Sequence, residues 1–239
     1  SDRPAVRRLG WGEILRLIPY LAWEAPRKIR VEFNFTTAEI ATLRLRLSAE
    51  TGAGLSANDV VCGHLMTVLA GLDDAPSERM LAIAVNYRHR VGLDAALVGN
   101  FVAPVEVPCH RGDNAAVMAA RIRHALDAYL DEHFSLHASL RYIREHGGTQ
   151  QIARCLPTAF DPLRKTLLVT NWSRFGVYDL GFGDQLPAYF TPVGGTPVPW
   201  AGWLVEGRGN QGLYFSAYLP RRTAQQFHSP EGQRRLKSL

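Results

Sequence analysis

The sequence predicts an α/β fold in which helices pack against a mixed β-sheet. Short apolar runs, typical of strands, are mixed irregularly with segments of helical period, about six of the former and five of the latter. The chain has 239 residues, of which 46% are hydrophobic, so it can bury a sizeable core. Such a mixture is typical of a two-layer or three-layer α/β sandwich.

Residues 1–26 are expected to form a linker that contains one short apolar helix, and residues 27–239 the domain proper. Prolines and glycines interrupt the first segment repeatedly, which disfavours a longer element. The aromatic residues of this segment would need a surface to cover them. They are Trp11, Tyr20 and Trp23.

Residues 28–35 alternate polar and apolar side chains, which predicts a strand with one solvated face. Thr36 and Glu39 then have the spacing of a capping box, and a helix is expected to run from there to Gly52. Ser56 and Asp59 repeat this spacing. The helix that follows, to about Leu69, is apolar on several sides and should be buried.

The remaining expected elements follow the same reasoning. Pro104 suggests a bulge or an edge position for the strand that contains it. The expected strands are 80–85, 101–107, 167–170, 200–206 and 213–219, and the expected helices are 114–129, 136–144 and a last one from 220.

Composition excludes several classes of function. The net charge of +5 suits an anionic ligand, but the basic residues are scattered and no nucleic-acid recognition motif is present. No apolar run approaches the roughly 20 residues of a membrane span. The cysteines are odd in number and widely spaced, which favours a reducing, cytoplasmic compartment. They are Cys62, Cys109 and Cys155.

The most informative stretch is 167–187, LLVTNWSRFGVYDLGFGDQLP. A buried strand ends in Thr170, Asn171, Trp172, Ser173 and Arg174, which bring a hydroxyl, an indole N–H and a guanidinium to one place. Active-site walls are built in this way. The alternative is a core strand that runs into an ordinary loop.

Four stretches, in order, resemble motifs of the BAHD family of acyl-CoA-dependent acyltransferases. TNWSRFGVYDLGFG resembles the family's T-S-W-x-R-x-P-x-Y-D-x-D-F-G-W-G signature. LSANDVVCGHLM resembles its I-S-S-F-D-A-L-x-A-H-x-W helix, VNYRHRV its V-D-G-R-x-R-L strand end, and VGNFV its F-G-N strand start. The resemblance covers about Arg27 to the C-terminus, and it implies the C-terminal half of a chloramphenicol-acetyltransferase-like fold.

The resemblance also implies a reaction, in which an acyl group passes from a coenzyme A thioester to a hydroxyl or amine of a small-molecule acceptor. Acyl-CoA would be a co-substrate, with no permanent cofactor. Thr170 and Trp172 match the family residues beside the reacting carbonyl, where donors stabilise an oxyanion. The positions implied on the coenzyme side, in part as structural braces, are Ser56, Arg88, Asn100 and Arg174.

The family's catalytic base, the His of an HxxxD motif, is missing from the sequence. None of the eight histidines is followed by Asp four residues later. We therefore expect this chain alone to be inactive, with the base supplied by an N-terminal half-domain on the same or a separate chain.

The signature loop departs from the family at two positions. Gly181 replaces the Asp that pairs with the Arg at position 88, and Asp184 replaces the Trp. Asp179 or Asp184 could provide the missing carboxylate.

Two alternatives remain open. One is a non-catalytic module that binds an acyl thioester or a protein. The other is a half-domain like the condensation domains of peptide synthetases, which take carrier-bound acyl groups. The GxGxxG pattern at 207–212 precedes an alternating strand, so it predicts a hairpin and not a dinucleotide site. His133 and His137 lie four residues apart but lack a third ligand, so they do not predict a metal site.

Overall fold

Six strands form one mixed sheet in the order β2-β8-β7-β6-β3-β4. The computed structural model describes residues 4–72, 78–94, 96–99, 101–129, 135–181, 183–192, 195–207, 209 and 211–238. Strand β6 lies parallel to both neighbours, β3 and β7, and the other pairs in this sheet are antiparallel. The strands are β2 (Ile29–Phe35), β3 (Glu78–Asn86), β4 (Val102–His110), β6 (Leu167–Asn171), β7 (Ala201–Glu206) and β8 (Leu213–Leu219).

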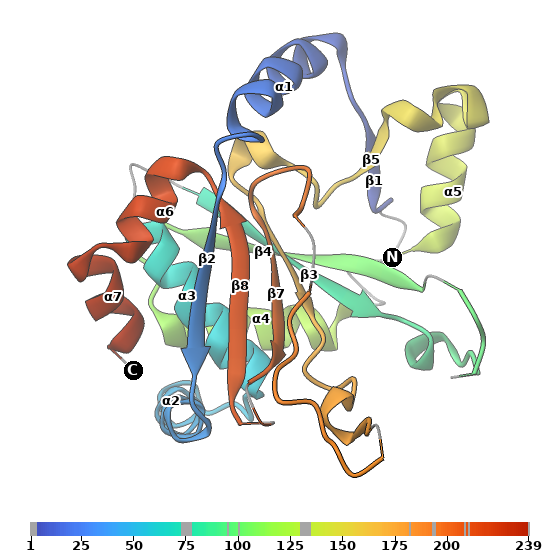
Figure 1. Ribbon diagram of the computed structural model, residues 1–239. Helices are drawn as coiled ribbons and strands as arrows, with labels where there is room; N and C mark the ends of the chain where they lie inside the picture. The colour runs from blue at the N-terminus through green and yellow to red at the C-terminus, as the bar shows by residue number, and fades with distance from the viewer. Residues whose placement is uncertain are drawn as a thin grey trace.

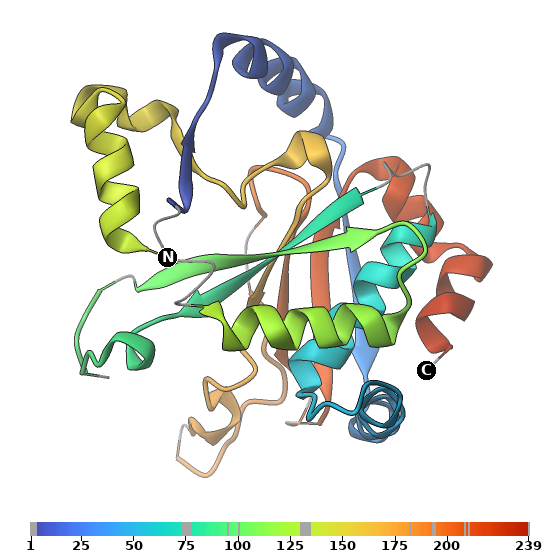
Figure 2. The same cartoon turned by 180° about the vertical axis from the view of Figure 1, so that it is seen from behind.

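Helices cover one face of this sheet, as Figures 1 and 2 show from opposite sides. Helices α3 and α4 pack against each other there, and Val31 and Phe35 of β2 are fully buried beneath the helical layer. The predicted α/β architecture is therefore confirmed. The helices of this layer are α2 (Thr37–Thr51), α3 (Ala57–Leu72), α4 (Ala115–Asp127), α6 (Arg221–His228) and α7 (Pro230–Lys237).

The local signals of the sequence appear where they were expected. The Thr36 side chain accepts a hydrogen bond from the Glu39 backbone, Glu39 reaches back to the Thr36 backbone, and Gly52 ends α2 in the left-handed conformation at φ 68°. Strand β4, which contains Pro104, lies at the edge of the sheet, where a missing N–H is tolerated.

The segment before residue 27 has more structure than the expected linker. Its β1 (Val6–Arg8) pairs with β5 (Cys155–Pro157), and α1 (Trp11–Glu24) follows. The Ala5 N–H donates to the hydroxyl of Ser139, at 3.0 Å, in α5 (Leu136–Glu145). We call this assembly of β1, β5 and α5 the upper ribbon, and it lies above the end of the large sheet in Figure 1. No described helix is long and apolar enough to cross a membrane.

The face of the sheet opposite these helices, which we call the open face, is covered in part: Val205 and Ser216 on it are buried, and Thr191 accepts a hydrogen bond from Arg30 at 2.8 Å. Arg30, Glu32 and Asn34 of β2 point to it because they alternate with the buried Val31 and Phe35. The register of the strands carries this alternation across the sheet to β6 and β3. Helix α1 also keeps Trp11, Leu15, Ile18 and Trp23 exposed, so its two tryptophans lack the cover that the sequence calls for, whereas Tyr20 is half-buried.

Candidate functional site

The three parallel strands β3, β6 and β7 end at the same edge of the sheet. Ligands of α/β proteins commonly bind outside the carboxyl ends of such strands. Thr170 lies one residue before the end of β6, half-buried, with Ala84 of β3 and Trp203 of β7 as its register partners. All three belong to the open face, so the Thr170 side chain projects on the side that no helix covers.

Trp172 follows the last residue of β6 and continues the path of that strand. Its backbone N–H donates to the Leu204 carbonyl at 2.7 Å, and strand alternation then places its side chain on the same face as Thr170. The indole stacks on Phe175, with ring centroids 5.6 Å apart, and lies 6.4 Å from the Phe190 ring. The structure thus brings together the two residues expected beside the reacting carbonyl.

A second group of predicted residues surrounds a hollow of about 330 Å³ at the same strand ends. Ser56 caps α3 as expected, because its hydroxyl accepts from the Asp59 N–H at 3.3 Å and Asp59 accepts from the Ser56 N–H at 2.8 Å. Arg174 also borders this hollow, which we call the basic hollow. Its other lining residues include Asn58, Ala84, Arg90, Arg123, Asn171 and Ser173.

Two of the arginines of the basic hollow were not anticipated from the sequence. Arg90 donates to the Leu126 carbonyl at 2.7 Å, and Arg123 pairs with Asp127 at 2.7 Å and with the fully buried Asp59 at 3.5 Å. Arg174 is exposed and has no ion-pair partner among the residues that the structure describes. The hollow therefore combines a helix N-terminus with guanidinium groups, an arrangement that favours anions.

Asn171 links the basic hollow to the strand that carries Thr170. Its side-chain amide donates to the Asn58 side chain in the first turn of α3 at 2.9 Å, and its oxygen accepts from the Ser173 N–H at 2.8 Å. Thr170 and Asn171 are successive residues on opposite faces of β6. One strand end therefore fixes both the open-face site and the basic hollow.

Arg88 lies outside both sites. Its guanidinium donates to the backbone carbonyls of Leu97 at 3.1 Å and Gly99 at 2.6 Å, and it stacks over the Phe101 ring at 4.5 Å. These contacts brace the turn between β3 and β4, so the Arg88 hydrogen bonds that the structure shows go to backbone carbonyls rather than to Asp179 or Asp184. Asn100 lies outside the described residues.

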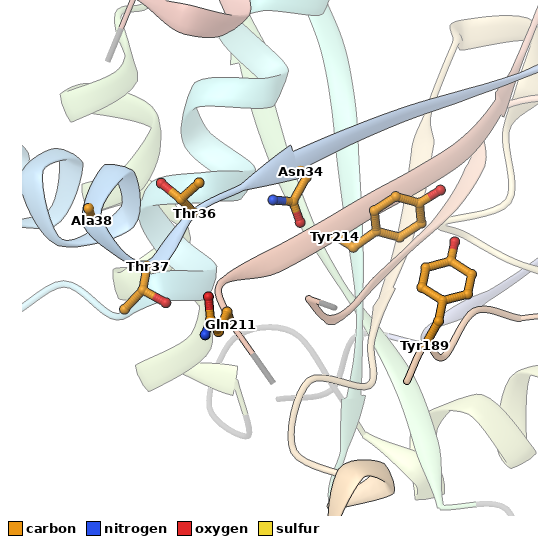
Figure 3. A pocket seen from close by; sticks show the side chains of 7 residues that line it. All are labelled: Asn34, Thr36, Thr37, Ala38, Tyr189, Gln211 and Tyr214. Carbon is orange, nitrogen blue, oxygen red and sulfur yellow. The ribbon is translucent and has the colours of Figure 1, made fainter. Parts of the chain in front are cut away.

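A second hollow, of about 580 Å³, opens beside β2 and β8 (Figure 3). Tyr189 and Tyr214 lie together at one side of it with ring centroids 5.9 Å apart, and Thr37 and Gln211 lie at the other. The pKa of Tyr214 is raised well above its usual value, mainly by burial and to a lesser extent by contacts with Glu32 and Tyr189. Nothing in the sequence signals this polar hollow, because its residues are far apart along the chain.

Two weaker motifs of the sequence concern a glycine-rich turn and a histidine pair. Gly207 donates to the Gly212 carbonyl at 3.1 Å in a turn between β7 and β8, which confirms a hairpin instead of a dinucleotide loop. His133 lies outside the described residues. Among those described, no cluster of His, Cys, Asp or Glu could hold a metal ion.

No family model and no curated protein matches this sequence. Solved structures do match the fold. TRI101 from F. graminearum, in complex with coenzyme A and deoxynivalenol, has a TM-score of 0.72 at 14% identity, over 87% of this chain and 48% of its own. Vinorine synthase has a TM-score of 0.64 at 20% identity, over 84% of this chain and 46% of its own.

These two proteins are BAHD acyltransferases, so the resemblance seen in the sequence is confirmed at the level of the fold, which is chloramphenicol-acetyltransferase-like. The chain spans about half the length of each. A nonribosomal peptide synthetase, FmoA3, matches less well, with a TM-score of 0.50 at 14% identity over 92% of this chain and 24% of its own.

Proposed function

We propose that this chain is the C-terminal half of a coenzyme A-dependent acyltransferase, which transfers an acyl group from the thioester to a hydroxyl or amine of a small molecule. The observation that carries the proposal is that Thr170 on the open face and Asn171 in the wall of the basic hollow are successive residues at the end of β6, on a fold shared with acyltransferase halves.

The basic hollow would bind the anionic part of coenzyme A. Phosphates favour helix N-termini and guanidinium groups, and Arg174 is exposed beside the N-terminus of α3. Arg123 is already held by Asp127 and Asp59, so its role is to fix the wall and contribute positive potential. The net charge of +5 would favour the approach of such a donor.

The open-face residues would act on the thioester carbonyl. The acceptor oxygen or nitrogen attacks the carbonyl carbon, a tetrahedral oxyanion forms, and the carbon–sulfur bond then breaks to release the coenzyme A thiol. Donation from the Thr170 hydroxyl and the Trp172 indole N–H would stabilise the oxyanion. Packing against Phe175 and Phe190 supports this role, because it limits motion of the indole.

A general base must still remove the proton from the acceptor. Among the described residues, no histidine lines the basic hollow, and the sequence has no HxxxD motif. We therefore place the base on an N-terminal half-domain that would cover the open face beside Thr170. The isolated chain would bind the donor and transfer the acyl group slowly or not at all.

The test uses the full protein, in which this chain is combined with the proposed N-terminal half-domain on the same or a separate chain. In that full protein, Thr170→Val keeps the shape of the side chain and removes the hydroxyl. We expect kcat/KM to fall about 100-fold to 1,000-fold, as for the loss of one oxyanion donor, with the same melting temperature. The matched control is Thr67→Val, whose hydroxyl bonds to the Gly63 carbonyl within α3 and which should retain near-normal rates.

Four results would overturn parts of the proposal. Full activity of Thr170→Val would remove its role in transition-state stabilisation. Normal turnover by the isolated chain would remove the need for a second half. Acyl transfer from a carrier-bound thioester but not from free acyl-CoA would favour the condensation-like alternative, and donor binding without transfer by the full protein would favour the binding module.

A further inference from the structure

An apolar cavity of about 340 Å³ lies between the open face and the upper ribbon. Strands β3, β4 and β6 form its floor, and the segment at and after β5 forms its opposite wall. Scarcely any polar atom lines it. The lining residues are Ala84, Val102, Ala103, Pro104, Leu156, Pro157, Ala159, Phe160 and Leu168.

The opposite wall is held in place by hydrogen bonds that do not involve the cavity. The β1–β5 pairing continues at both ends, because the Thr158 N–H donates to the Ala5 carbonyl and the Leu9 N–H donates to the Arg154 carbonyl at 2.8 Å. The Arg8 N–H also donates to the Tyr142 hydroxyl of α5 at 3.1 Å. These bonds within the upper ribbon fix the shape of the opposite wall.

The cavity is apolar but not filled by the chain. Phe160 and Leu168 remain partly exposed within it, and Val102 is 50% exposed at its rim. Residues on the other face of the same strands, such as Val105 and Val169, are almost completely buried. An uncovered apolar wall in such a cavity is suited to a hydrocarbon group, which gains by leaving water.

The position of the cavity relates it to the proposed reaction. Ala84 lines both the apolar cavity and the basic hollow, and it is the register partner of Thr170. Leu168, in the cavity floor, precedes Thr170 by two residues and therefore shares its face of β6. The basic hollow, Thr170 and the apolar cavity are thus neighbours on β3 and β6, with Ala84 common to the two hollows.

We infer that the apolar cavity binds the hydrocarbon part of the thioester's acyl group, so that the donor is an unbranched aliphatic acyl thioester of medium length. This inference rests on the proposed function, because it takes Thr170 to mark the thioester carbonyl. At about 30 Å³ for each water-sized group, the cavity has room for roughly ten such groups, which corresponds to about ten carbons. A carboxylated acyl group, such as a dicarboxylic acid half-thioester, would lose its hydration here without a partner.

The experiment measures binding, so it does not depend on a complete active site. S-acyl-N-acetylcysteamine thioesters with 2 to 14 carbons are titrated into the full protein by calorimetry, alongside coenzyme A and the matching acyl-CoA series. Burial of each methylene should raise the affinity about threefold to fourfold. The gain should stop at about ten carbons, when the cavity is full.

Two variants should move the chain length at which the gain stops, in opposite directions. Val102→Phe fills the rim of the cavity and should shorten the limit by about two to four carbons, and Phe160→Ala enlarges the cavity and should lengthen it. Val98→Phe is the matched control, because Val98 is 95% exposed and does not line the cavity. Circular dichroism melting identifies a variant that fails to fold, and the opposite variant then decides the question.

The outcomes separate this inference from the proposed function. Affinity that is independent of chain length, or a limit that stays the same in both folded cavity variants, would overturn the acyl assignment. So would decanol binding without competition from decanoyl thioester, because the cavity would then hold another molecule. If the thioester series behaves as expected but coenzyme A adds no affinity, the cavity assignment stands and the coenzyme A donor of the proposed function fails.

Discussion

Replacement of Gly63 by Ala tests the packing of the two helices that frame the basic hollow. Gly63 lies in the middle of α3, buried against α4. A Cβ atom there would lie 2.9 Å from the Ala119 nitrogen and 3.0 Å from the Ala115 oxygen. Both are backbone atoms, so no side chain can rotate away and the helices must move apart.

The sign of the effect follows from two opposing contributions. Alanine is more favourable than glycine inside a helix by about 1 kcal/mol. Forcing an extra carbon into a well-packed contact costs about 1–3 kcal/mol, and the contact with backbone places this substitution in the upper half of that range. We therefore expect a net loss of about 1–2 kcal/mol, which lowers the melting temperature of a chain of this size by about 2–8 °C.

Gly71→Ala provides a control in the same helix with the opposite expected sign. Gly71 is exposed, and a Cβ atom there meets only the guanidinium end of the Arg235 side chain, which can move. The helix preference then dominates, so the melting temperature should stay the same or rise. Both variants are measured by circular dichroism against temperature and urea. The reasoning would be refuted by a Gly63→Ala protein as stable as the wild type.

Two further predictions concern buried groups. His64 is buried, with its Nε2 3.0 Å from the Leu236 carbonyl, and burial lowers its pKa below the usual value of about 6.5. The unfolded chain therefore takes up the proton first, so the free energy of unfolding should fall as the pH decreases below about 6.5. His64→Gln should flatten that part of the curve, and an unchanged pH dependence would contradict the assignment. Burial raises the pKa of Cys109 to about 11 and raises that of the fully buried Cys62, so a disulfide reagent at pH 8 should react quickly only with the half-buried Cys155. Rapid modification of more than one thiol in the native chain would disprove this.

Much of the fold was predictable because its signals are local. The period-two pattern of residues 28–35 specifies a strand with one buried face wherever that strand lies in the sheet. The Thr36–Glu39 box and Gly52 likewise fix the two ends of α2 through hydrogen bonds within a few residues. Strand β1 was not predicted, because it depends on pairing with Cys155–Pro157, far along the chain.

The candidate site likewise has a part that local sequence signals predict and a part that depends on distant segments. The sequence by itself determined that Thr170 and Trp172 stand at the end of a buried strand, since side chains two residues apart on a strand share a face. It also determined that Ser56 caps a helix, because that bond spans three residues.

Only the tertiary structure decided what these residues face. Strand β6 lies between β3 and β7, and this order places Thr170 beside Ala84, which lines both the basic hollow and the apolar cavity. It also assigned Arg88 to the carbonyls of its own turn, a partner that no spacing indicates. The physical reason is that a hollow is made by backbones and side chains from distant segments, whose mutual positions depend on the packing of the whole sheet and its helices.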